Sequence, residues 1–116
     1  MIDFTPTLVK ALNTILPTHY ELKLSSGTKT PCISYQERSN AAQEQGNTLG
    51  YSRISYTIKV WGNDLEQLNK YAQQIDNVLR PMGWKRTGAN ELHSYQSAMI
   101  QKILTYECLA LETFDK

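Results

Sequence analysis

The chain has 116 residues and a mass of 13.2 kDa, the size of one domain, with an ordinary globular share of hydrophobic residues. Twelve lysines and arginines against eleven aspartates and glutamates leave a formal net charge of +1, which removes the usual electrostatic footprint of nucleic-acid or anionic-membrane binding. No apolar run approaches the roughly 18–20 residues of a membrane helix, and no secretory signal is found at the N-terminus. We expect a single soluble domain over residues 1–116.

The first elements expected along the chain are a short helix and two strands. Thr5 favours the N-cap and Pro6 the first helical position, and Pro17 ends the helix. Alternation of apolar and polar residues predicts a strand over 19–24, and a second strand over 32–36 follows a segment rich in turn residues. The helix is too short to be stable alone, so we expect it to cover a sheet.

Residues 39–50 form a polar stretch in which Leu49 is the one large apolar residue. Few side chains here could stabilise burial, so we expect a long, exposed, mobile loop that connects two strands. Loops of this length are uncommon inside a compact domain and tend to be functional or disordered.

The centre of the chain predicts its two clearest elements. Residues 51–61 alternate between apolar and polar, which is typical of a half-buried strand. A continuous apolar stripe over 65–82 predicts a long helix that faces a core. Asn63 and Glu66 resemble a capping box at its start, and Gly83 follows as a stop.

The last third predicts a short strand over 84–86, a turn at 88–90 and a final strand over 103–111. Apolar residues on both faces of this final strand indicate an interior or interface-covered strand. The element order is therefore α–β–β–β–α–β–β. It predicts an α+β fold, with a mainly antiparallel sheet and two helices packed on one face.

No combination of residues indicates a catalytic or metal site. Cys32 and Cys108 lack the spacing of a disulfide framework or a metal site, and nothing in the sequence brings either of them to His19 or His93. We expect two reduced, core-facing thiols, no cofactor, no metal and no enzymatic activity.

The aromatic residues and arginines leave two functional alternatives. Trp84, Lys85 and Arg86, together with Arg53, could stack on and neutralise a single strand, as in a small nucleic-acid-binding or regulatory module. In the other interpretation, Trp84 packs on the helix end and the chain buries a sheet face or edge against protein neighbours. The near-zero net charge favours protein contacts.

Five stretches also carry a family resemblance: Ile33–Asn40, Ile54–Gly62, Asp64–Met82, Met82–Thr87 and Ile103–Glu107. With the chain length and the element order, they resemble the tail-terminator proteins of long-tailed bacteriophages and prophages, which are also called tail-completion or tail-to-head joining proteins. The resemblance covers nearly the whole chain and includes no catalytic motif.

The resemblance implies a structural virion assembly protein, a homo-oligomer ring that usually has six subunits. Such a ring caps the last ring of the major tail-tube protein, ends tube polymerisation, and offers a surface to the head-connector or stopper protein. The implied location is the bacterial host cytoplasm during assembly and then the tail–head junction of the virion. Neither a membrane nor sequence-specific nucleic acid is an expected partner.

Loop position and residue type, rather than a family motif, suggest the contact residues. Four polar residues are expected to contact the tube or the connector: Gln43, Glu44, Gln45 and Asn47. Tyr51 and Arg53 are expected to contact the neighbouring subunit.

Overall fold

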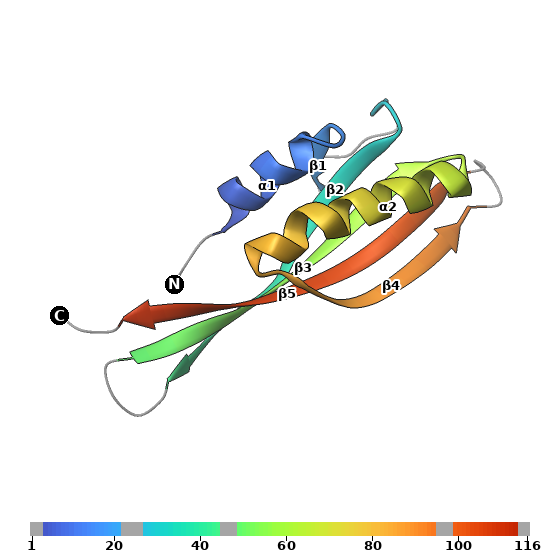
Figure 1. The fold of residues 1–116 in the computed structure, drawn as a ribbon. Coiled ribbons are helices and arrows are strands. Elements are labelled where there is room, and N and C mark those ends of the chain that lie inside the picture. The colour runs from blue at the N-terminus through green and yellow to red at the C-terminus, as the bar shows by residue number, and fades with distance from the viewer. Residues whose placement is uncertain (1–3, 22–26, 45–48, 95–98, 114–116) are drawn as a thin grey trace.

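The computed structural model describes residues 4–21, 27–44, 49–94 and 99–113, of which 39–44, 49–52 and 110–113 are described by their backbone alone. The chain begins with α1 (Thr5–Asn13), β1 (Thr18–Tyr20), β2 (Cys32–Glu44) and β3 (Leu49–Gly62). It continues with α2 (Leu65–Leu79), the short 3-10 helix η2 (Arg80–Met82), β4 (Lys85–His93) and β5 (Ile100–Thr113). The predicted α+β fold and element order are confirmed (Figure 1).

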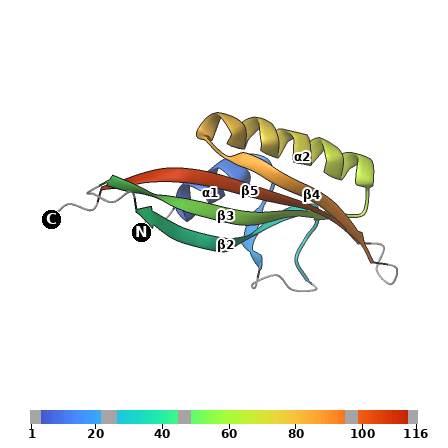
Figure 2. The same ribbon diagram turned by 90° about the horizontal axis from the view of Figure 1, so that it is seen from below.

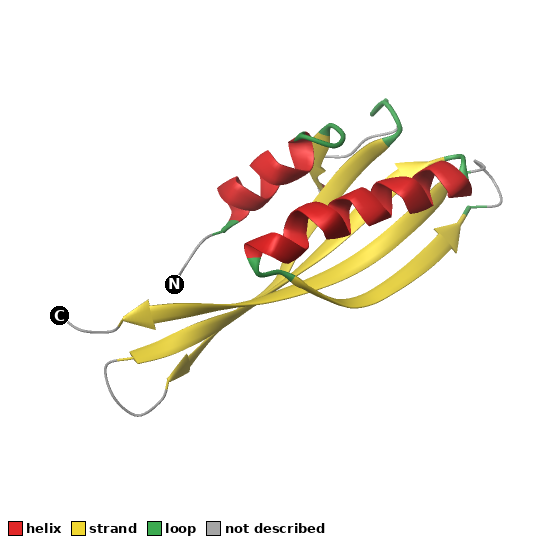
Figure 3. Ribbon diagram, in the orientation of Figure 1, coloured by secondary structure: helices red, strands yellow, loops and turns green. Residues whose placement is uncertain are grey.

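The described strands join one sheet in the order β1-β2-β3-β5-β4 (Figure 3). β1 pairs in parallel with β2, and the other neighbours are antiparallel, so the sheet is mainly antiparallel as predicted. β3 and β5 pair along their whole length, from Leu49 opposite Thr113 to Gly62 opposite Ile100. β5 is therefore an interior strand of the sheet, although the helices cover only one of its two faces.

Both helices cover the same face of the sheet, as Figures 1 and 2 show. Alternate residues of β3 face the helices and are fully buried, while α1 contributes Leu8 and Leu12 to the same core. The stripe of α2 that packs on the sheet consists of Leu68, Ala72, Ile75 and Leu79. Because apolar burial contributes about 25 cal/mol per Å², this layer is the main source of stability.

Two tyrosines at the centre of the sheet fix the helices in place. Tyr56 and Tyr106 lie opposite each other on β3 and β5, and both are fully buried. The Tyr106 hydroxyl donates to Asp76 of α2 at 3.0 Å, while the Tyr56 hydroxyl is hydrogen-bonded to the Thr5 hydroxyl of α1. Each helix is thus tied to the sheet by a different tyrosine, which satisfies both buried hydroxyls.

The start of α2 differs by one residue from the prediction, because Asp64 rather than Asn63 is the N-cap. Its carboxylate accepts hydrogen bonds from the backbone N–H groups of Glu66 at 3.1 Å and Gln67 at 3.5 Å. These are the second and third helical residues, whose N–H groups have no partner within the helix. At the other end Gly83 adopts φ 95°, the left-handed stop that was predicted.

The start of α1 also differs from the prediction. Thr5 is the first helical residue and Phe4 is the N-cap, without a side-chain cap, and the helix ends at Asn13, before Pro17. The Thr5 hydroxyl contacts Tyr56. Tertiary packing therefore replaces the local cap that the sequence suggests.

The prediction of a loop over 39–50 is wrong in its boundaries. β2 continues to Glu44 and β3 begins at Leu49, with Gln43 opposite Tyr51 and Glu44 opposite Gly50. Ladder hydrogen bonds join backbone groups and need no apolar side chains, so a polar sequence can extend a hairpin that neighbouring strands support.

The turn predicted at 88–90 is also wrong, because these residues belong to β4. A register shift between Arg86 and Gly88 marks a β-bulge, and Gly88 then pairs with Thr105 as a residue of the strand. The first strand, predicted over 19–24, is observed as β1 from Thr18 to Tyr20. Glu21 lies outside it, and 22–24 fall outside the described residues.

Candidate protein-interaction surface

The sheet extends beyond both helices. We call this extension, made by residues 39–44, 49–53 and 109–113 of β2, β3 and β5, the arm (Figure 1). It accounts for the elongated shape of the chain, which measures 53 × 25 × 23 Å. Neither α1 nor α2 reaches the arm, so the strands there are covered by no described helix.

The face of the sheet opposite the helices, which we call the open face, carries exposed apolar side chains. Leu92 on β4 and Leu109 on β5 are 55% and 56% exposed, more than any other large hydrophobic residue whose side chain is described. Ile103 lies on the same face between them, opposite Asn90 in register. Exposed leucines on a rigid sheet are a feature of protein contact surfaces, although one alone would be unremarkable.

One end of the open face is covered. The Lys59 ammonium lies 2.6 Å from the carboxylate of Glu21, so the side chain of this residue after β1 reaches β3. The Trp61 indole N–H donates to the Ser34 hydroxyl at 2.9 Å, and Cys32 and Ser34 are almost fully buried. The covered part of the face therefore lies over β2 and β3 at this end, and the uncovered part includes Leu92 on β4 and runs along β5 toward the arm.

β4 and the stretch of β2 beyond its pairing with β1 carry features that oppose pairing with a strand of another chain. β4 has its bulge after Arg86 and bears charges at Lys85 and Glu91. β2 has a bulge after Glu37, beside the exposed Arg38. Bulges and edge charges are the usual protection against edge-to-edge association. The sheet is therefore better suited to partners on its face than at its edges.

The four predicted contact residues that the structure describes lie in the arm, namely Gln43, Glu44, Tyr51 and Arg53. Gln45 and Asn47 are outside the described residues, and the backbone places Gln43 and Glu44 at the end of β2. Tyr51 lies opposite Gln43 on β3, so the structure brings a predicted tube contact and a predicted subunit contact together.

Arg53 is the predicted contact residue whose side chain is described, and it lies on the open face. Its Nε is 3.6 Å from a Glu107 carboxylate oxygen, and the side chains are 54% and 35% exposed. An exposed pair of this kind contributes about 0–1 kcal/mol to stability. Both groups can therefore exchange partners when another surface arrives.

Trp84 is not available to stack on a nucleic-acid base. It is 5% exposed and makes edge-on ring contacts with Phe4 and Tyr56 at centroid distances of 6.4 and 5.6 Å. Lys85 and Arg86 are exposed beside it. The expected packing of Trp84 is thus confirmed, and contact of the sheet with protein neighbours stays a prediction.

The two thiols are shielded by burial, and His93 contacts a carboxylate. Burial raises the pKa of the Cys32 and Cys108 thiols, and a protonated thiol is a poor nucleophile. The His93 ring lies 3.4 Å from Glu91, whose pKa is lowered by hydrogen bonds from Lys102 and His93. Within the described residues no group of three or more histidines, cysteines and carboxylates could hold a metal ion. No described helix has the length and apolar character needed to cross a membrane.

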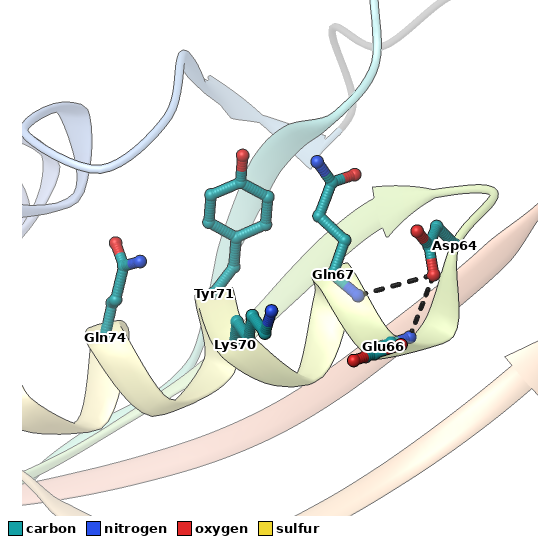
Figure 4. Close-up of a pocket in the computed structure, with 6 residues that line it drawn as sticks. All are labelled: Asp64, Glu66, Gln67, Lys70, Tyr71 and Gln74. Carbon is teal, nitrogen blue, oxygen red and sulfur yellow. Dashed lines mark hydrogen bonds between the residues drawn. The ribbon is translucent and has the colours of Figure 1, made fainter.

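A polar hollow of about 400 Å³ lies along α2 (Figure 4). Figure 4 shows Gln67, Tyr71 and Gln74 projecting from the same side of the helix. The lining residues other than Tyr71 are exposed, and Asp64 is engaged in capping α2. This hollow is a solvated helix surface that offers amide hydrogen bonds.

A smaller, mainly apolar hollow of about 90 Å³ lies where the helices end and the arm begins. We call it the end hollow, and it is lined by Phe4, Thr7, Met82, Trp84 and Cys108. Sequence patterns indicated neither this hollow nor the exposure of Leu92 and Leu109. The one signal was the alternation of 103–111, which assigns Cys108 and Leu109 to opposite faces.

No protein-family model matches the chain, and no curated protein matches it.

Proposed function

We propose that the chain is a structural virion assembly protein of the tail-terminator kind, a subunit of a ring that caps the tail tube and joins the tail to the head. The observation that carries the proposal is the uncovered part of the open face, which bears exposed leucines and continues into an arm that no described helix covers. A monomeric domain of this size gains nothing from leaving such a surface in water.

The size of the open face suits contact with a single protein neighbour. β3 and β5 have 14 residues each and β4 has 9. At about 3.4 Å per residue and about 4.8 Å per strand, the three strands together cover roughly 600 Å². Standard interfaces bury about 800 Å² per partner, so one neighbour would use the whole of this face together with surface beside it.

The arm supports a second contact, with the tube or the connector. It extends past the helical layer, and it carries Gln43, Glu44 and Tyr51 in its backbone register. A subunit could therefore contact its neighbour through the body of the sheet and another ring through the arm. The formal net charge of +1 is compatible with partners that are proteins.

The proposal is tested first by the solution mass over a range of protein and salt concentrations. Six copies of the 13.2 kDa chain in a closed ring would weigh about 79 kDa. Adding the protein to polymerising tail-tube protein should then give tubes of limited length, with density at one end in electron micrographs. Full-length tube growth with no bound protein would contradict the proposal, as would salt-sensitive binding to single-stranded oligonucleotides in place of tubes.

A matched pair of variants tests the arm. Glu44→Gln removes a charge from the end of β2, and Glu66→Gln removes one from the exposed start of α2. We expect Glu44→Gln to weaken tube capping several-fold and Glu66→Gln to leave it unchanged. Equal capping by both variants would exclude Glu44 from the contact.

A further inference from the structure

An exposed apolar residue and an apolar hollow occupy opposite sides of the sheet at the same place on β5. Leu109 lies on the open face with 56% of its surface exposed. Cys108, the residue before it, packs toward the helices and lines the end hollow. Successive residues of a strand point to opposite faces, so Leu109 and the end hollow lie back to back.

The end hollow has the size and chemistry to accept a leucine side chain. A cavity of 150 Å³ binds benzene, so the four carbons of a leucine side chain would need about 100 Å³ in proportion. The end hollow measures about 90 Å³. Trp84 and Phe4 supply aromatic surface, and Met82, which is 39% exposed, gives a flexible wall that can adjust to the entering group.

We propose that Leu109 of one copy inserts into the end hollow of a second copy of this chain. Each copy offers an exposed leucine on one face and a hollow on the other, so the contact is heterologous and repeats from copy to copy. A heterologous contact closes into a ring when its rotation divides the circle, and otherwise it produces a filament. The inference rests on the proposed function, because it names a contact through which the ring would form.

Leu92 provides a matched control. It lies on the same open face with 55% of its surface exposed, opposite Gln101, which is eight positions from Leu109 along β5. At about 3.4 Å per residue the two positions are about 27 Å apart. A general hydrophobic attraction would depend on both leucines, whereas insertion into the end hollow depends on Leu109.

The first experiment compares self-association of the wild-type protein, Leu109→Ser and Leu92→Ser by sedimentation velocity from micromolar to millimolar concentration. We expect Leu109→Ser to raise the dissociation constant at least about tenfold, as loss of a buried anchor does, and Leu92→Ser to change it less than about twofold. Equal effects of the two variants would overturn the inference. A wild-type protein that stays monomeric over the whole range would overturn it too.

The second experiment traps the contact covalently. Leu109→Cys would bring a new thiol to the Cys108 thiol in the end hollow of the next copy. Mild oxidation should then produce a ladder of disulfide-linked oligomers on a non-reducing gel, which disappears in the double variant Leu109→Cys, Cys108→Ser. We expect no ladder from Leu92→Cys. A ladder that survives Cys108→Ser would contradict the assignment of the hollow.

Tube capping separates this inference from the proposed function. Suppose that Leu109→Ser fails to associate and that wild-type oligomers do not cap tubes. The contact between Leu109 and the end hollow is then supported, and the tail-terminator role is refuted. If Leu109→Ser caps tubes as well as the wild-type protein, the role stands and the contact is refuted.

Discussion

The two faces of one sheet differ in what covers them. On the helix face, β3 contributes Tyr56 and Ile58, which are fully buried beneath α1 and α2. On the open face, the neighbouring residues Ser55 and Thr57 are only partly buried, and Leu92 on β4 is exposed. The first face stabilises the fold, and the second has apolar surface left for a partner. Adjacent residues of a single strand can therefore differ completely in their role.

The largest expected effect tests this comparison at adjacent residues of β3. Ile58→Ala should lower the free energy of unfolding by about 2–5 kcal/mol, because it opens a cavity beneath the helices. Thr57→Ala, on the open face, should change it by less than about 0.5 kcal/mol. Urea denaturation of both variants would measure the difference, and similar losses would show that the open face is also part of the core.

A smaller effect is expected where α2 is tied to the sheet. Asp76→Ala removes the acceptor of the Tyr106 hydroxyl and should cost about 1–3 kcal/mol, because that buried hydroxyl loses its partner. Arg80, which donates to Asp76 at 2.7 Å, is largely exposed and can turn to solvent. A double-mutant cycle of Asp76→Ala with Tyr106→Phe isolates the hydrogen bond, and additive effects would rule out coupling between the two residues.

The burial of Tyr106, together with its hydrogen bond to Asp76, makes the stability of the fold sensitive to alkaline pH. Burial, and then the hydrogen bond to Asp76, raise the pKa of Tyr106 well above its usual value. The unfolded chain releases this proton near pH 10, where the folded chain still holds it. Stability is therefore complete below about pH 10 and falls as the pH rises further. Denaturation curves from pH 9 to 11 should show a shallower loss for Tyr106→Phe, and an unchanged slope would refute this account.

A loss of about 1 kcal/mol in the free energy of unfolding is expected from Gly83→Ala at the end of the helical layer. Gly83 has φ 95°, and an added Cβ there would meet no atom within 4 Å, so Gly83→Ala tests the backbone conformation alone. Gly88→Ala is the control, because a Cβ at that position would only touch Thr105 at 3.9 Å. A thermal melt in which Gly88→Ala loses more stability than Gly83→Ala would contradict the importance of the backbone conformation at Gly83.

The smallest effect on stability is expected on the open face itself. Arg53→Ala removes an exposed ion pair with Glu107 and should change the free energy of unfolding by less than about 0.5 kcal/mol. Because Arg53 is the neighbour of Leu109 in register, the same variant should weaken self-association. A variant that loses stability but associates normally would place Arg53 in the fold rather than in the contact.

The fold was predictable wherever apolar residues followed a clear period. The stripe of α2 and the alternation of β3 come from side chains that the core must bury, so both were recognised with small errors at their ends. The extension of β2 over 39–44 and the continuation of β4 beyond 86 were missed, because pairing with neighbouring strands holds them and their own sequences are mostly polar. A glycine next to a bulge, such as Gly88, looks the same in sequence as a glycine in a turn, so a turn was predicted there.

The candidate surface was predictable only in outline. A contact through a sheet face or edge, and the contact role of Tyr51 and Arg53, were predicted from the sequence and stay predictions. The end hollow brings together α1, η2 and β5, which are far apart along the chain, so no local pattern could indicate it. The exposure of Leu92 and Leu109 depends on which face the helices cover, and only the assembled fold decides that.

The two tryptophans stand on opposite sides of the sheet, and this gives the protein a pair of separate optical reporters. Trp84 emits from beneath the helices, beside Tyr56, while Trp61 is hydrogen-bonded to Ser34 on the other side. Replacing either one with phenylalanine would leave a fluorescence signal from a single face. The spectrum could then follow, in real time, which side of the subunit changes its surroundings as copies come together.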